Sequence, residues 1–275
     1  MQWFDLKLWL GALCLGAVVF LAVFGNLLTS HRPDEQNLMV SLEPPNLLSD
    51  YPLGTDQLGR DILARMVSGA RVSLAIAASV VVLSGGFGLL LGALSGYFGG
   101  VRDTIIQKVV ETMWAFPPIL LAITILAFFG QSLGNVILAL SIQRWIPYCR
   151  IARAQALTLR GKDFVSASRI MGGRTVWIMS HHIVPNLIAS AIVVGTFSMA
   201  TAILAEASLS FLGIGVPPDI ATYGGMLADG RSYVTEAWWL AVIPGLGIFF
   251  TVLGLNLIGD ALRDQYDPKS HLNIG

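Results

Sequence analysis

The sequence is poor in charge and in cysteine, and both shortages narrow the class of protein. Charged residues make up 12% of the chain, whereas a soluble domain carries about 25%. The net charge is zero, so overall charge gives no indication of a nucleic-acid partner. The two cysteines, Cys14 and Cys149, lie in or beside apolar segments without a CxxC spacing. They indicate neither a disulfide framework nor a metal site.

Motifs for nucleotide chemistry and for hydrolysis are also missing. The chain has no GxxxxGK[ST] sequence, and its only Gly-Lys pair, Gly161-Lys162, is followed by Asp163 and lacks the upstream glycine. It has no HExxH, no CxxC and no nucleophile elbow. We therefore expect no catalytic residue, no metal site and no cofactor site in this chain, and we do not expect an enzyme.

Apolar length is what the sequence has in abundance, since hydrophobic residues make up 55% of it. A helix needs about 20 apolar residues to cross a bilayer. The pattern predicts an all-α integral membrane protein, with one domain over residues 1–275 and six transmembrane helices. The expected helices are 8–28, 72–98, 105–129, 133–148, 187–211 and 238–258.

Two of these segments are ambiguous in sequence. The segment 8–28 could be a signal peptide, but it is long for one and no A-x-A-like site follows it, so we expect a retained helix. The segment 133–148 is the least regular, because Gln143, Arg144 and Pro147 interrupt it. We expect it to run out of the membrane into the helical stretch that follows.

Lysine and arginine in the connecting segments predict the orientation. The segment 150–186 holds six of them, whereas 213–237 holds only Arg231. The segment 29–71 has four arginines but also six acids. An excess of Lys and Arg in short loops marks the cytoplasmic side. We therefore expect cytoplasmic N- and C-termini, a cytoplasmic segment 150–186, and outer loops at 29–71 and 213–237.

Glycines recur every four residues in the segment 72–98 and just beyond it, at Gly88, Gly92, Gly96 and Gly100. Residues four apart share a helix face, and glycine there lets a second backbone approach closely. This pattern predicts a helix-packing seam, within the chain or against a partner. In the next segment, Pro117-Pro118 predicts a kink or break of the kind that often lies beside a transport path.

Glu206 is an acid inside an apolar segment, which makes it a candidate functional residue. The predicted topology places it toward the outer end of its helix. A structural hydrogen bond to the outer loop, or a contact with a partner subunit, is one interpretation. A contact with substrate is the other.

The basic segment in the middle of the chain predicts two short helices. Asp163 can cap a helix in which Phe164, Ala167, Ser168 and Met171 form a narrow stripe on one face. Gly172-Gly173 ends that helix, and a second can run from Thr175 to Val184 before Pro185. The stripe can be buried in the groove of a soluble partner. Alternatively, the basic residues hold the loop on lipid headgroups.

This block resembles the EAA loop of ABC-importer permeases, in its small residues Ser166-Ala167-Ser168, the glycine Gly172 and the closing Pro185. Three other stretches resemble the second permease of the peptide/nickel importer subfamily. These are LGTDQLGRD at 53–61, AEASLSFLGIG at 205–215, and GDALRD at 259–264 followed by Asp267-Pro268. With the six-segment layout, the resemblance covers residues 8–268. Ser166 departs from the pattern, because the family places a glutamate there.

The resemblance implies a type I importer permease fold in a bacterial inner membrane, with cytoplasmic coupling helices. It implies a homologous permease as partner, two cytoplasmic ATPase subunits that bind ATP and Mg²⁺, and an extracytoplasmic substrate-binding protein. The residues 163, 164, 166–168, 171, 172 and 185 would form the coupling loop. Peptide is the expected substrate, and nickel or a metal chelate is the alternative. A secondary transporter or channel without an ATPase is the more distant alternative.

Overall fold

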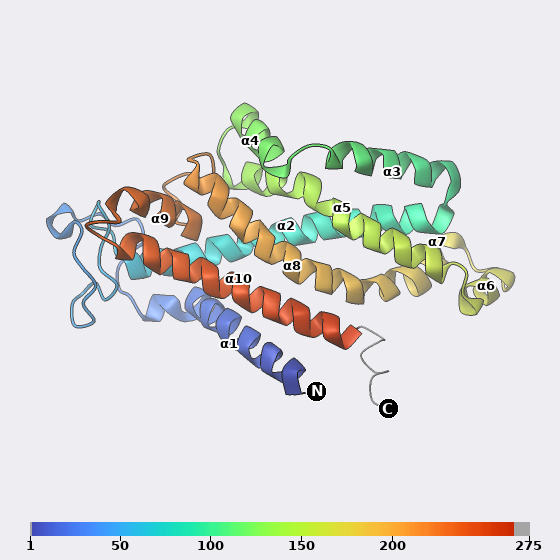
Figure 1. Ribbon diagram of the computed structural model, residues 1–275, viewed down its shortest axis with the longest axis horizontal. Coiled ribbons are helices and arrows are strands. Elements are labelled where there is room, and N and C mark those ends of the chain that lie inside the picture. The colour runs from blue at the N-terminus through green and yellow to red at the C-terminus, as the bar shows by residue number, and fades with distance from the viewer. Residues whose placement is uncertain (1, 267–275) are drawn as a thin grey trace.

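The computed structural model describes residues 2–266 and forms an elongated bundle of helices (Figure 1). Residues 2–266 form no β-strand. The α-helices are α1 (Gln2–Phe24), α2 (Ile62–Phe98), α3 (Gly100–Trp114), α4 (Pro118–Phe129), α5 (Leu133–Leu159), α6 (Asp163–Ile170), α7 (Thr175–Ile178), α8 (Val184–Phe211), α9 (Tyr223–Gly230) and α10 (Trp239–Tyr266). The short helices are the 3-10 segments η1 (Gly25–Leu27), η2 (Leu38–Val40) and η4 (Arg231–Tyr233), and the π-helical η3 (Met179–Ile183). Asp267 and Pro268 lie outside the described residues.

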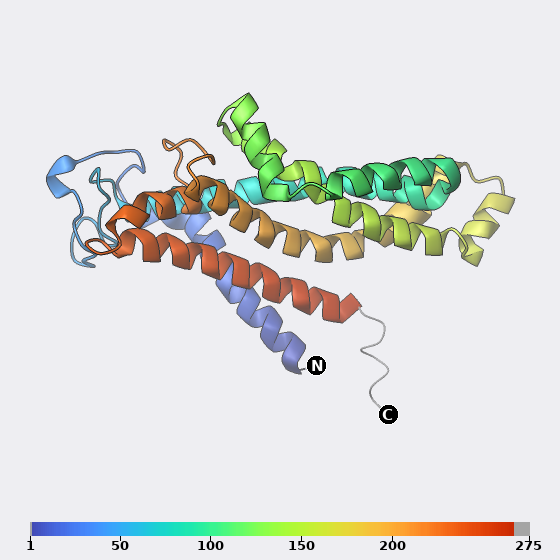
Figure 2. The ribbon, with the colours of Figure 1, turned by 45° about the horizontal axis from the view of Figure 1, so that its top comes forward.

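Four helical stretches between residues 2 and 266 are long and apolar enough to cross a membrane: Leu6–Leu27, Ile62–Phe98, Thr175–Phe211 and Trp239–Tyr266. The pair α3 and α4, bent by 83°, makes a fifth if it is one broken span. The sixth expected segment lies in α5, which does not meet this criterion because it carries several arginines and Gln143. It nevertheless runs beside α2 in both views (Figures 1 and 2).

Several helices extend beyond the expected apolar spans. Helix α2 begins at Ile62, ten residues before the expected 72, because the side chain of Asp61 accepts a hydrogen bond from the Leu63 amide (2.9 Å) and caps it. Helix α5 continues past 148 to Leu159, as expected for a segment that leaves the membrane. Helix α10 runs to Tyr266 instead of ending near 258.

Helices α2 and α5 form the central contact of the bundle, and glycines allow it. A Cβ atom on Gly88, Gly92 or Gly96 would overlap a backbone oxygen of α5: that of Trp145, Cys149 or Arg153, respectively. The four-residue interval is therefore the same on both helices. Gly100 does not belong to this seam: it has open space around it and a φ of +58°, and it is the first residue of α3.

The helix break at Pro117 and Pro118 is stabilised by a side chain of α5. Helix α3 ends at Trp114 and α4 begins at Pro118, because proline suits the first turn of a helix but not its interior. The side-chain amide of Gln143 donates to the carbonyl oxygens of Met113 and Phe116, at 2.5 and 2.8 Å. It thereby satisfies carbonyls that the break leaves without a helical partner.

The loops divide between the two ends of the bundle. The segments 25–61 and 212–238, with α9, lie together at one end, whereas α6 and α7 lie at the other (Figures 1 and 2). Helices α1 and α10 run side by side, with Gly11 close to Gly254, and the amine of Lys7 bonds to Asp264 at 2.9 Å. The bundle therefore has two distinct polar ends joined by long helices.

Candidate functional site

The first candidate site is the exposed face of α6, at the tip of the molecule (Figure 1). Phe164 and Met171 are 45% and 81% exposed, and Ala167 is exposed beside them. Ser168 lies on the opposite, buried side, so the expected stripe is divided between the two faces. Ile170, 87% exposed, joins the outer face although the sequence interpretation missed it. Its spacing of three from Ala167 was the available signal.

The buried face of α6 explains this division. Val165 is fully buried in a small core with Ile178 and Ile183 of the segment that follows, and with Tyr97 of α2. Burying these apolar side chains anchors the tip to the long helices. Helix α6 therefore has partners for one face within its own chain, and its other face remains exposed.

The ends of α6 are formed by backbone geometry. Lys162 is the N-cap, without a side-chain hydrogen bond, and Asp163 is the first helical residue, so Asp163 does not cap the helix as expected. Its negative charge still suits a helix N-terminus. At the other end Gly172 has a φ of +82°, and the amides of Gly172 and Gly173 bond to the carbonyls of Arg169 and Ser168. This Schellman motif favours glycine at position 172. Ser166 is exposed.

The run from α7 into α8 is continuous helix, where the sequence suggested a stop at Pro185. Helix α7, η3 and α8 follow one another without a break, and Pro185 lies in the first turn of α8. The amide of Val184 bonds to the Met179 carbonyl, five residues back, in the wider π-helical turn. That turn absorbs the interruption that a proline causes, because proline has no amide hydrogen.

An aromatic cluster ties α6 to this connection. The Trp177 ring stacks on His181 with centroids 4.8 Å apart, and its edge contacts His182 at 5.0 Å. The ring of Phe164 lies 5.6 Å from that of His182. A force on α6 therefore reaches the start of α8 through ring contacts as well as through the backbone.

Glu206 lies at the other end of α8 and is 1% exposed. Its Oε1 accepts hydrogen bonds from the hydroxyls of Ser210 (2.8 Å) and Thr222 (2.9 Å). Thr222 is the N-cap of α9, so the carboxylate joins α8 to α9. Glu206 therefore makes a structural contact with the segment that precedes α9.

The end of the bundle opposite α6 also contains a cluster of four charges, of which Asp56, Arg60 and Arg65 are buried and Asp229 is partly exposed. The carboxylate of Asp56 accepts from Arg60 (2.6 Å) and from Arg65 (3.1 Å). Asp229 of α9 contacts the same two arginines, at 3.5 and 3.2 Å. The group joins the segment 53–61, α2 and α9, and its two positive charges are matched by two negative ones.

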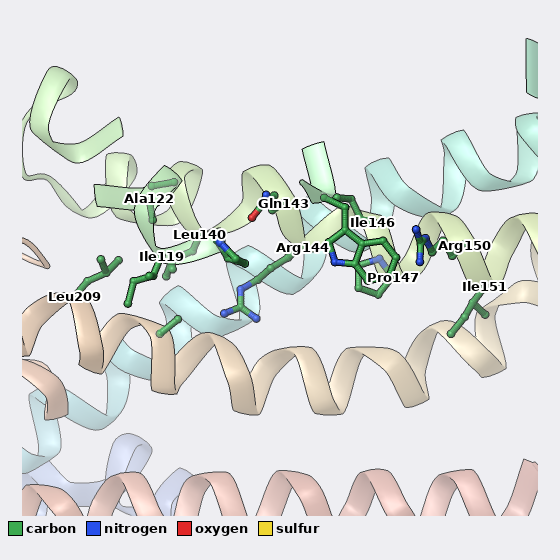
Figure 3. Close-up of a pocket in the computed structure, with 14 residues that line it drawn as sticks. Ile119, Ala122, Leu140, Gln143, Arg144, Ile146, Pro147, Arg150, Ile151 and Leu209 are labelled. Carbon is green, nitrogen blue, oxygen red and sulfur yellow. The ribbon is translucent and has the colours of Figure 1, made fainter. Parts of the chain in front are cut away.

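The third feature is a cavity of about 560 Å³ between α4, α5 and α8, in the size range of small-molecule sites (Figure 3). It is bordered by Trp114, Pro118, Ile119, Ala122, Ala139, Leu140, Gln143, Arg144, Ile146, Pro147, Arg150, Ile151, Ala205 and Leu209. Most of these side chains are apolar, and none is acidic. The sequence interpretation treated Arg144 only as an interruption of a helix.

Similarity to characterised families was found at three levels. Residues 88–271 match the family of binding-protein-dependent transport system inner membrane components. A putative peptide transport system permease protein of Brucella suis is 43% identical over 261 residues, which cover 94% of this chain and 87% of that one. The di/tripeptide transport system permease protein DppC of Pseudomonas aeruginosa is 41% identical, with coverages of 94% and 87%. The oligopeptide transport system permease protein OppC of Bacillus subtilis is 36% identical, with coverages of 94% and 84%.

The fold matches a solved transporter structure. A chain of the MetNI methionine ABC transporter, in an inward-facing conformation, superposes with a TM-score of 0.59 at 17% sequence identity. The match covers 74% of this chain and 97% of the other. At that identity the likeness concerns the fold, which is that of a type I importer permease.

Proposed function

The chain belongs to the family of binding-protein-dependent transport system inner membrane components, and from this premise we propose that it forms half of a path for peptides. It is the membrane permease component of an ATP-driven importer, a class that works with ATPase subunits and a substrate-binding protein. Peptide as substrate is supported by relatives that are 36–43% identical to it and belong to peptide transport systems. Nickel or a metal chelate is the competing substrate class.

The exposed face of α6 is the proposed contact with an ATPase subunit. The exposure of this face is the main support for a role in coupling. Phe164, Ala167, Ile170 and Met171 present apolar surface, whereas Val165 holds the helix to the bundle. An exposed apolar helix face on a rigid base fits a groove in a soluble partner. The family's usual glutamate is Ser166 here, so the contact relies on apolar packing and not on that charge.

The other end of the bundle is the proposed receiving side for the binding protein. The segments 25–61 and 212–238 gather there around the buried charges of Asp56, Arg60 and Arg65 and the partly exposed Asp229. The excess of Lys and Arg at the α6 end supports a cytoplasmic position for that end and for both termini. A second, homologous permease would complete the path. ATP and Mg²⁺ would bind to the ATPase subunits, with no cofactor in this chain.

Uptake by the assembled transporter tests this function. The chain, its second permease, the ATPase subunits and the binding protein are reconstituted in proteoliposomes, and entry of a labelled dipeptide is followed with and without ATP. We expect uptake that requires both ATP and the binding protein. Parallel vesicles receive ⁶³Ni²⁺ with and without a chelator. ATP-driven entry of nickel without peptide entry would overturn the peptide assignment.

A further inference from the structure

Arg144 is a cation deep in the membrane-spanning part of the bundle, and it has no acidic partner in the described part of the chain. It lies eleven residues after the start of α5, which places it about 16 Å along the helix axis, near the middle of a bilayer. Such a charge is costly in a membrane and marks a functional position by default. Headgroup phosphates lie far from this depth, so the cation needs another kind of partner.

The guanidinium of Arg144 is held in place but not neutralised. Its Nη1 donates to the Thr201 hydroxyl at 2.7 Å and its Nη2 to the Thr201 carbonyl at 2.9 Å. Both acceptors are uncharged, and Nε is buried without a hydrogen-bond partner among the described atoms. A guanidinium has five N–H donors, so three remain. Arg144 is only partly buried and points from α5 toward α8, where it borders the cavity (Figure 3).

The surrounding cavity is cationic and apolar at once. Arg150 lies on the same cavity wall six residues further along α5, about 9 Å toward the α6 end, with its guanidinium 3.3 Å from the centre of the Trp114 ring. The cavity residues include no aspartate or glutamate to balance these two charges. Gln143 is turned toward the carbonyls of Met113 and Phe116. The cavity therefore suits a ligand with one anionic group and apolar surface.

We propose that Arg144 binds the carboxylate of the substrate as it passes through the membrane, so that this chain prefers peptides with a free C-terminus. A carboxylate matches the planar guanidinium and forms charge-assisted hydrogen bonds with it. The apolar wall around Arg144 accommodates the adjoining side chain. Arg150 provides a second position for the same group, nearer the α6 end. The inference rests on the proposed peptide function, because a metal ion would be repelled by both arginines.

The experiment compares a dipeptide with its C-terminal amide in proteoliposomes that contain the complete transporter. The pair is chosen so that the binding protein binds both, and each is supplied on saturated binding protein. The readout is the ratio of the two transport rates. Any preference of the binding protein is the same for every permease variant, so it cancels when the ratios of variants are compared.

In the Arg144→Gln variant we expect the ratio of the dipeptide transport rate to the amide transport rate to fall at least about tenfold. The free energy of a hydrogen bond to a charged group is large enough for such a change. Arg144→Lys keeps the charge and should retain most of the preference, which also guards against a variant that fails to fold. Arg102→Gln is the matched control. Arg102 is on α3, outside the cavity, and lies over the ring of Phe98 at the end of α2, so this substitution should leave the ratio unchanged.

An unchanged ratio in assembled Arg144→Gln transporter would overturn the proposal, as would an equal loss for both substrates. A pairing of Arg144 with an acid of the second permease would give a different result. Arg144→Gln would then lose the second permease on purification, and Arg144→Lys would transport the dipeptide and its amide without preference. That outcome would also overturn the proposal. Failure of the peptide function itself is distinct, because no variant, including the unmodified chain, would then transport either peptide.

Discussion

Gly92 lies in the middle of the seam between α2 and α5. A Cβ there would overlap the carbonyl oxygen of Cys149 and crowd the methyl group of Ala152. We expect Gly92→Ala to destabilise the helix pair by about 1–3 kcal/mol, the usual cost of overpacking. Gly86→Ala is the control, because Gly86 lies on the same helix in open space. SDS-induced unfolding of the purified protein measures both, and equal stabilities would contradict the seam.

Glu206 acts through its oxygen atoms and not through its charge alone. In Glu206→Gln an amide oxygen can still accept from Ser210 and Thr222, so we expect near-normal stability. In Glu206→Leu both buried hydroxyls lose their acceptor, which costs about 1–3 kcal/mol each. Thermal stability and complex assembly are measured separately from transport. Normal assembly of Glu206→Gln with complete loss of transport would favour a direct contact with substrate.

Helix α6 is the element through which the molecule meets its ATPase, if the proposed coupling is correct. Met171→Glu places a charge on the exposed apolar face, and burying it in the partner's groove without a counter-ion is unfavourable. We expect loss of the ATPase subunits on purification, with the permease itself still folded. Met39→Glu is the matched control, because Met39 is 93% exposed at the opposite end. Retention of the ATPase by Met171→Glu would argue against the contact.

The joint between α6 and α8 differs from a simple hinge. The turn at Gly172 is a fixed Schellman motif, and the run from Thr175 to Phe211 is helical throughout, including η3. The stacked rings of Trp177 and His181 stiffen its first turns. A displacement of α6 would therefore move the start of α8 as a unit.

At the scale of the whole molecule, the end opposite α6 is held together by charges that are mostly removed from water. Asp56 is 3% exposed and compensates Arg60 and Arg65. We expect Asp56→Asn to cost about 3–5 kcal/mol, because it leaves buried arginines with too little negative charge. SDS unfolding of the purified protein measures this. The control is Asp34→Asn, whose partner Arg32 is on the surface and which should leave stability unchanged. A small effect at Asp56 would show that water reaches the cluster.

Local sequence patterns predicted much of this architecture. Apolar length placed the helices, because any helix that crosses lipid must be long and apolar. The interval between Gly88, Gly92 and Gly96 indicated a close helix contact, and the structure places α5 against it. Gly172 indicated the end of α6, because a positive φ favours glycine. Gly100 shares the interval but begins the next helix, α3, and spacing alone cannot reveal that the helix changes there.

The sequence by itself determined the long apolar helices and the position of the basic segment, because these depend on residues adjacent along the chain. Only the tertiary structure decided which side of α6 is exposed, since Val165 and Ser168 turn inward to meet α2 and the start of α8. It also decided that Glu206 meets Thr222 and that Arg144 meets Thr201. Those pairs are 16 and 57 residues apart, and only the packing of whole helices brings them together.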